Sequence, residues 1–102
     1  MTLPVFLHIE VTPNPNEMEA LQSYLSQAPR LIQAHGGVPI ATYDVERALD
    51  DANSPAVFVV VSFPSRDAID NFFADRAYQA IVPVRDLGFS HLGFLLPVNA
   101  FN

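Results

Sequence analysis

The apolar residues of the chain fall into two patterns, which together predict a sheet with helices between its strands. Four short stretches are apolar on one or both sides of an extended chain and read as strands: 4–12, 38–44, 56–63 and 90–97. Between the first two strands, and again between the last two, apolar residues recur every three or four positions, as on one side of an α-helix. The predicted order is β-α-β-β-α-β.

The first helix is expected over residues 17–34, with a kink or a break near 26–29. Pro29 lies inside the helical pattern, where it removes a backbone donor and clashes with the preceding turn. Gly36 and Gly37 follow the pattern, and a glycine in the left-handed conformation is a common end for a helix.

Residues that favour helix starts suggest where the helices begin. Asn14 or Asn16 can cap the first helix, and Ser65 can cap the second. A shorter helical piece is expected over 77–82, ending at Pro83 because proline interrupts a helix.

This order of elements predicts an α+β fold. Right-handed crossovers place both helices on one face of a four-stranded antiparallel sheet. However, residues 57–61 are apolar on both sides of their strand, and residues 92–96 nearly so, which is typical of a strand covered on both faces. No third helix is predicted, so we expect a second copy of the chain to cover the other face and form a homodimer. Residues 1–102 are expected to form a single domain.

Composition narrows the classes of function. The chain carries 11 acidic and 5 basic residues, a net charge of −6, which argues against nucleic acid as a partner. All the basic residues are arginine, so lysine Schiff-base chemistry is excluded, and the absence of cysteine excludes disulfides and thiolate metal sites. The opening residues lack the basic segment of a secretory signal, and no apolar run approaches the roughly 20 residues of a membrane span. We therefore expect a cytoplasmic protein with no membrane partner.

The first strand contains the main candidate for chemistry. His8 and Glu10 lie on the same side of it, and His91 and Ser62 lie on the strands expected beside it. A histidine close to a carboxylate can act as a general acid or base near neutral pH, so His8, Glu10 and His91 are the candidate catalytic residues. The alternative is a structural polar cluster, or a strand end that reaches solvent.

A metal site is not expected. Two histidines and one carboxylate can bind a metal, but a His-X-Glu spacing on a strand is common by chance. The sequence also lacks a glycine-rich phosphate loop and a haem-attachment motif, so no cofactor is expected.

Several other residues are candidates for ligand binding, each with a structural alternative. An arginine can hold a carboxylate ligand or pair with a neighbouring aspartate, and an aromatic residue can face a pocket or pack in the core. His35, at the end of the first helix, is expected to interact with the helix dipole instead. The candidates for ligand binding are Ser62, Arg85, Tyr43, Tyr78 and Phe72.

A series of short motifs runs through most of the chain: Phe63-Pro64-Ser65, the pair Phe72-Phe73, Tyr78-Gln79 and Arg85, with Ala28-Pro29 and Gly36-Gly37 upstream. In these motifs and their spacing, the chain resembles the family called domain of unknown function 1330. The resemblance implies a ferredoxin-like fold and a dimeric α/β barrel, in a superfamily that includes cofactor-free monooxygenases, isomerases, cyclases and haem enzymes. This sequence departs from the family pattern at Ser62, at Asp51-Ala52-Asn53 and at Arg76-Ala77, where the family usually has acidic or aromatic groups.

Two functions follow as hypotheses. The first is a cofactor-independent enzyme of the isomerase, cyclase or monooxygenase type, which performs acid–base chemistry on a small apolar metabolite. The second is a non-catalytic module that binds a small ligand or serves only as a structural dimer. A cavity beside His8 would favour the enzyme.

Overall fold

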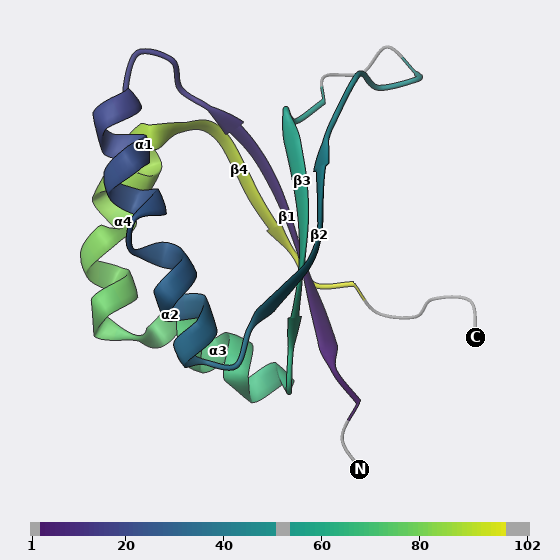
Figure 1. Ribbon diagram of the computed structural model, residues 1–102, viewed down its shortest axis with the longest axis vertical. Helices are drawn as coiled ribbons and strands as arrows, with labels where there is room; N and C mark the ends of the chain where they lie inside the picture. The colour runs from purple at the N-terminus through teal and green to yellow at the C-terminus, as the bar shows by residue number, and fades with distance from the viewer. Residues whose placement is uncertain (1–2, 51–53, 98–102) are drawn as a thin grey trace.

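The computed structural model describes residues 3–50 and 54–97, which form one antiparallel sheet with helices on one side (Figure 1). The sheet order is β2-β3-β1-β4, with β1 and β3 in the centre. This is the ferredoxin-like α+β arrangement that the sequence predicts. The strands are β1 (Val5–Pro13), β2 (Val38–Asp44), β3 (Val57–Phe63) and β4 (Phe89–Leu95), and the helices are α1 (Met18–Leu25), α2 (Ala28–Ala34), α3 (Arg66–Ala74) and α4 (Arg76–Gly88).

The pairing register decides which side chains face the helices. Leu7 pairs with Val61, and both are buried under the helices, while their neighbours His8 and Val60 pair with each other on the opposite side. We call that opposite side the open face. It also carries large apolar side chains exposed by 39% or more: Phe6, Val38, Tyr43 and Leu95.

The predicted break in the first helix is confirmed. The helical stretch divides into α1 and α2, and Pro29 occupies the first turn of α2, where its missing N–H costs no helical hydrogen bond. Gly36 ends α2 with a φ of +82°, and the Gly37 N–H donates to the Ile32 carbonyl at 2.8 Å. This confirms the left-handed glycine end expected from the sequence.

The cap predicted for the start of the first helix was wrong. Glu17, rather than Asn14 or Asn16, holds the cap position of α1 and makes no capping side-chain bond. The Asn14 side chain instead accepts a hydrogen bond from the Asn16 N–H, so it shapes the preceding turn. Ser65 does cap α3, since its hydroxyl accepts from the Ala68 N–H at 3.1 Å.

The prediction that the last helical piece ends at Pro83 was wrong. Helix α4 continues through this proline to Gly88. Its far end lies directly against α1, where a Cβ atom on Gly88 would be only 2.8 Å from the Leu21 Cα. This close packing accounts for the continuation, because tertiary contacts outweigh one lost backbone hydrogen bond.

Aromatic rings fill the core between the sheet and the helices. Phe63, Phe72 and Tyr78 are each exposed by 1% or less, and the Phe72 ring lies 4.4 Å from the Tyr78 ring, centroid to centroid. Phe73 is only half-buried at the edge of this cluster. None of the helices in the described part of the chain is long and apolar enough to span a membrane.

Replacing Phe72 with alanine should lower the free energy of unfolding by about 3–5 kcal/mol, because it empties a fully buried ring site. Phe73→Ala is the matched control and should cost clearly less. Urea denaturation of both variants measures the difference. Equal losses would contradict the burial described for these two rings.

An ion pair joins the end of α2 to the junction of α3 and α4. His35, at the C-terminal cap of α2, lies 2.8 Å from the Asp75 carboxylate, which also accepts from the Ala77 N–H to cap α4. These two hydrogen bonds lower the pKa of Asp75 below its ordinary value of 3.8. His35 therefore holds the C-terminal cap position of α2, and its ring links α2 to the junction of α3 and α4.

A lowered carboxylate pKa stabilises the fold above the unfolded-state pKa and loses that effect as pH falls through the folded-state pKa. Asp75→Asn keeps an N-terminal cap but removes the charge. The wild-type protein should therefore lose stability more steeply than this variant below about pH 4. Thermal denaturation at several pH values measures this, and parallel curves would count against the pair.

Candidate functional site

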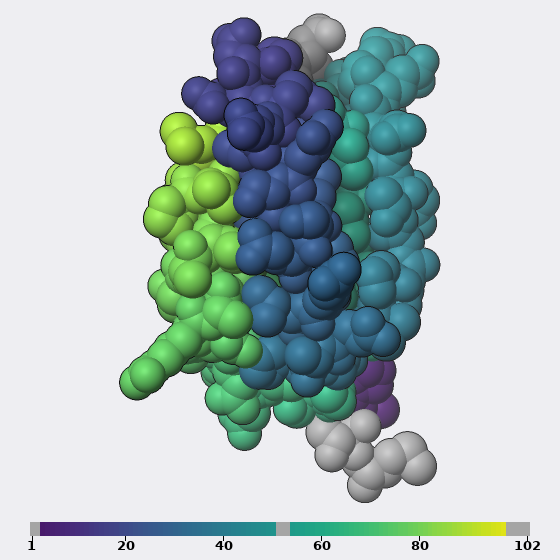
Figure 2. Space-filling model, turned by 60° about the vertical axis from the view of Figure 1, so that its left-hand side comes forward, coloured from purple at the N-terminus to yellow at the C-terminus, as the bar shows by residue number. Residues whose placement is uncertain are grey.

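A cavity of about 390 Å³ lies between the sheet and the broken helix α1–α2. All four strands, both helices and Phe72 of α3 contribute to its walls. Its mouth follows the groove between α1–α2 and the edge strand β2, where the surface is hollowed (Figure 2). Side chains of β1, β3 and β4 form most of the wall on the side of the sheet.

The walls of the cavity are almost entirely apolar. Val59 and Val61 of β3 lie on one side, and Leu21 and Ala28 of the helices lie on the other. Among the described residues that line it, none carries a charged side chain, and only Tyr24 and Thr42 have side chains that can form hydrogen bonds. Such a space suits a neutral, mainly apolar molecule.

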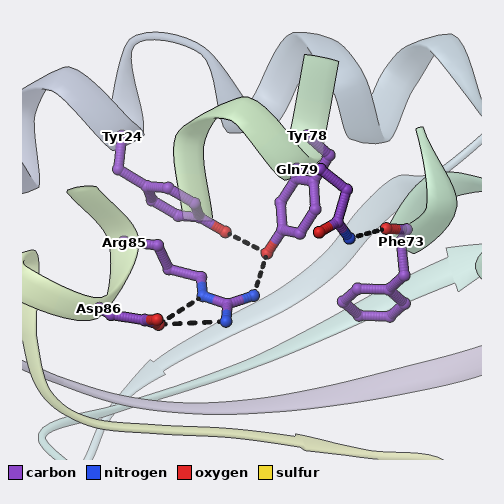
Figure 3. Close-up of polar contacts among 6 residues, drawn as sticks. All are labelled: Tyr24, Phe73, Tyr78, Gln79, Arg85 and Asp86. Atoms are coloured by element: carbon purple, nitrogen blue, oxygen red, sulfur yellow. Dashed lines mark hydrogen bonds and ion pairs between the residues drawn. The ribbon is translucent and has the colours of Figure 1, made fainter. Parts of the chain in front are cut away.

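Tyr24 connects the cavity to a buried polar network. Its hydroxyl lies 2.9 Å from the Tyr78 hydroxyl, and the Arg85 guanidinium donates to that same Tyr78 oxygen at 3.1 Å (Figure 3). Arg85 also donates to the Asp86 carboxylate at 3.1 Å and lies 5.8 Å from the centre of the Phe94 ring. The network thus runs from a charged pair at the surface to a phenol in the cavity wall.

Burial and hydrogen bonds determine the pKa values of Tyr24 and Arg85 in this network. Burial is the main cause that raises the pKa of Tyr24, so this phenol stays neutral. Burial by itself would lower the pKa of Arg85, but the hydrogen bonds with Tyr78 and Asp86 outweigh it and raise the pKa. Tyr24 is therefore a hydrogen-bonding group and not a base.

The candidate catalytic residues lie on the open face, away from the cavity. Glu10 and His91 are in contact, with the Glu10 Oε2 3.4 Å from the His91 Nε2, and 54% of the His91 side chain is exposed. The His8 ring instead packs edge-on against the Phe58 ring, with their centroids 5.4 Å apart. The structure thus brings Glu10 and His91 together and places His8 beside them on the same face.

The candidate ligand-binding residues divide between the two faces. Ser62 pairs with Phe6 on the open face, and Tyr43 lies on the same face with 59% of its surface exposed. Phe72 lines the cavity, while Tyr78 and Arg85 stand behind it and reach it through Tyr24. The predicted residues therefore do not form one site.

Tyr24 was not predicted from the sequence. It lies three residues after Leu21 and four before Ala28, so it belongs to the buried stripe of the broken helix. A tyrosine within such a stripe was the available signal, because a buried phenol usually requires a hydrogen-bond partner. Within the described ranges, no group of three or more histidine, aspartate or glutamate side chains could hold a metal ion.

Solved structures share the fold of the chain at low sequence identity. A protein of unknown function from Rhodopseudomonas palustris superimposes with a TM-score of 0.76 at 18% identity, over 97% of this chain and 85% of that one. A Nitrosomonas europaea protein, provisionally named an antibiotic biosynthesis monooxygenase, gives 0.64 at 10% identity, over 99% and 94%. An uncharacterised NIPSNAP domain protein from Burkholderia xenovorans gives 0.58 at 14% identity, over 96% and 95%.

Sequence comparison places the chain in one family. No protein of curated function matches it. The profile of the family described as domain of unknown function 1330 (DUF1330), however, matches residues 6–92, which include all four strands and all four helices except for the outermost strand residues. The chain therefore belongs to the DUF1330 family, as its aromatic and glycine motifs indicated.

Proposed function

We propose that the protein binds a small, neutral and largely apolar molecule in the cavity between the sheet and α1–α2. The observation that carries this proposal is the cavity itself, whose volume of about 390 Å³ falls within the range usual for small-molecule sites. Protein cores are normally closely packed, and an empty space lined by apolar side chains lowers the stability of the fold. A ligand that fills the space offsets this cost.

The composition of the walls supports a neutral ligand. A charged group would lose its hydration on entering, and no lining side chain carries an opposite charge to compensate. The charge on Arg85, which reaches the cavity through the two tyrosine hydroxyls, is already paired with Asp86. The apolar body of a ligand, in contrast, gains by leaving water.

The acid–base hypothesis receives less support from the geometry. His8, Glu10 and His91 lie on the other side of the sheet from the cavity, so they have no direct path to a ligand inside it. Chemistry by these residues would require a ligand on the open face. The contact between Glu10 and His91 is the observation that favours acid–base chemistry on the open face as a second candidate function.

Blocking the cavity should abolish ligand binding. Val59 lines the cavity, whereas its neighbour Val60 faces the opposite side of the same strand. We expect Val59→Phe to weaken binding of the fluorescent hydrocarbon 2-isopropenylnaphthalene by at least about tenfold, since the added ring occupies the ligand volume. Val60→Phe, the matched control, should leave binding within about twofold.

Fluorescence titration measures both affinities, and circular dichroism confirms that both variants fold. The proposal fails if the wild-type protein does not bind this hydrocarbon. It also fails if Val60→Phe, and not Val59→Phe, removes binding.

We also propose that a second copy of the chain covers the open face. Apolar side chains are spread over that face from β2 to β4, and all four helices lie on the other side (Figure 1). Monomeric proteins rarely expose a continuous apolar surface of this kind. A second copy presents the same flat, apolar surface and would bury Tyr43 and Leu95 of each chain without any additional segment.

Charges placed on the open face should separate the copies. The double substitution Tyr43→Asp with Leu95→Asp alters two exposed residues at opposite edges of this face. We expect it to change the mass measured by light scattering from twice 11.2 kDa to 11.2 kDa at micromolar concentration. Met18→Asp with Leu87→Asp, exposed on the helices, should leave the mass unchanged, and a monomeric wild-type protein would refute the proposal.

A further inference from the structure

The network behind the cavity has a direction that can be read from donor and acceptor chemistry. A guanidinium has only N–H donors, so the Tyr78 oxygen must accept the hydrogen bond from Arg85. The Tyr78 hydroxyl still has one hydrogen to donate. Among the contacts described for this hydroxyl, the remaining partner is the Tyr24 oxygen, 2.9 Å away.

The positions of the two phenols favour one way of arranging the Tyr24–Tyr78 bond, because Tyr78 is enclosed in the core at 0% exposure, whereas Tyr24 is 7% exposed and lines the cavity. If Tyr24 donates, the Tyr78 hydrogen has no acceptor among the described contacts, and Tyr78 is completely buried. An unsatisfied donor at such a position is unfavourable. If Tyr78 donates, both of its polar functions are used, and the free hydrogen belongs to Tyr24 instead.

Tyr24 is the member of this network that lines the cavity. Its hydroxyl stands at the end of a chain of hydrogen bonds that starts at a cation. Hydrogen bonds in such a chain polarise one another, which strengthens the last donor. A neutral phenol in this position can donate a hydrogen bond to an oxygen atom of the ligand.

We infer that Tyr24 recognises a ligand that has one acceptor oxygen on an apolar body, such as an aromatic or alicyclic ketone or a quinone. This inference rests on the proposed function of the cavity, and it names the class of molecule and the residue that selects it. A ligand that carries only donors, such as an ammonium compound, would leave the Tyr24 hydrogen unpaired. A carboxylate would lose its hydration among apolar walls with no free cation beside it.

Thr42 is the other polar side chain in the cavity wall, and it offers a matched control. It lies on the edge strand β2 and is exposed to solvent, at the rim of the cavity. Its hydroxyl can bond to water without a ligand, so it contributes little to selecting one. The buried hydroxyl of Tyr24 has no such alternative.

A pair of isosteric probes tests the inference. 2-Acetylnaphthalene has a carbonyl oxygen where 2-isopropenylnaphthalene has a methylene carbon, and the two are otherwise closely matched in shape. We expect Tyr24→Phe to weaken binding of the ketone by about tenfold and to change binding of the hydrocarbon by less than about twofold. Thr42→Val should weaken binding of the ketone clearly less than Tyr24→Phe does, because the rim hydroxyl can bond to water without a ligand.

Infrared spectroscopy gives a second readout that a purely structural role of Tyr24 would not affect. The carbonyl stretching band of the bound ketone should lie at lower frequency in the wild-type protein than in Tyr24→Phe, because a hydrogen bond weakens the carbonyl bond. Arg85→Met should reduce this shift of the carbonyl band in part, because the substitution removes the positive charge at the start of the network. Circular dichroism of each variant confirms that it folds.

The possible results distinguish the role of Tyr24 from the more general proposal that the cavity binds a ligand. If neither probe binds the wild-type protein, the cavity does not take small apolar ligands and both are overturned. If both probes bind but Tyr24→Phe affects them equally and the carbonyl band does not move, only the role of Tyr24 is overturned. A selective loss of the ketone in Thr42→Val would overturn it too, in favour of the rim hydroxyl.

Discussion

The two-residue period of the central strands is the constraint on which the rest of the structure depends. In β1 and β3, each residue faces the side opposite to its neighbours, so Ile9 lines the cavity while His8 and Glu10 face away from it. The backbone layer of the sheet keeps these two environments separate. As a result, the protein has an apolar cavity on one side and a polar pair within an apolar surface on the other, and no described contact connects them.

The cavity itself follows from how the first helix is broken. Pro29 begins α2 without loss of a helical hydrogen bond, and the Gly36 turn then returns the chain to β2 at the sheet edge. At the other end, the close contact of Gly88 with Leu21 draws α1 toward α4 and so toward the β1–β4 side of the sheet. The cavity remains between these helices and the sheet, with walls that include residues of all four strands.

Most of the fold could be predicted from the sequence, because strand alternation, the glycine turn and the serine cap are local signals. The strands and the break at Pro29 follow from such signals, whereas the central place of β1 and β3 follows from the ferredoxin-like order of the elements. The extent of α4 could not, because its continuation through Pro83 depends on contact with α1, which is distant in sequence. The start of α1 was misplaced for a different reason: an asparagine can close a turn as readily as it caps a helix, and Asn14 does the former.

The candidate site was harder to predict, because residue type alone does not show which side of a sheet a group faces. His8 and Glu10 carry reactive groups, but the register of β1 places both on the open face. Tyr24 fits an apolar helical stripe, and in such a stripe the sequence pattern indicates only a buried core residue. Its importance emerges only in three dimensions, where Tyr78 and Arg85 meet its hydroxyl.

The buried network also explains why an apolar cavity would keep a tyrosine at this position. If packing were the only requirement, phenylalanine would fill the same space without a hydroxyl to satisfy. The chain instead buries two phenols and part of an arginine and connects them to a surface carboxylate, an arrangement in which each polar group depends on the next. Arg85 donates to both Asp86 and Tyr78, and the Tyr78 hydroxyl lies 2.9 Å from that of Tyr24, so the network ends at a residue of the cavity wall.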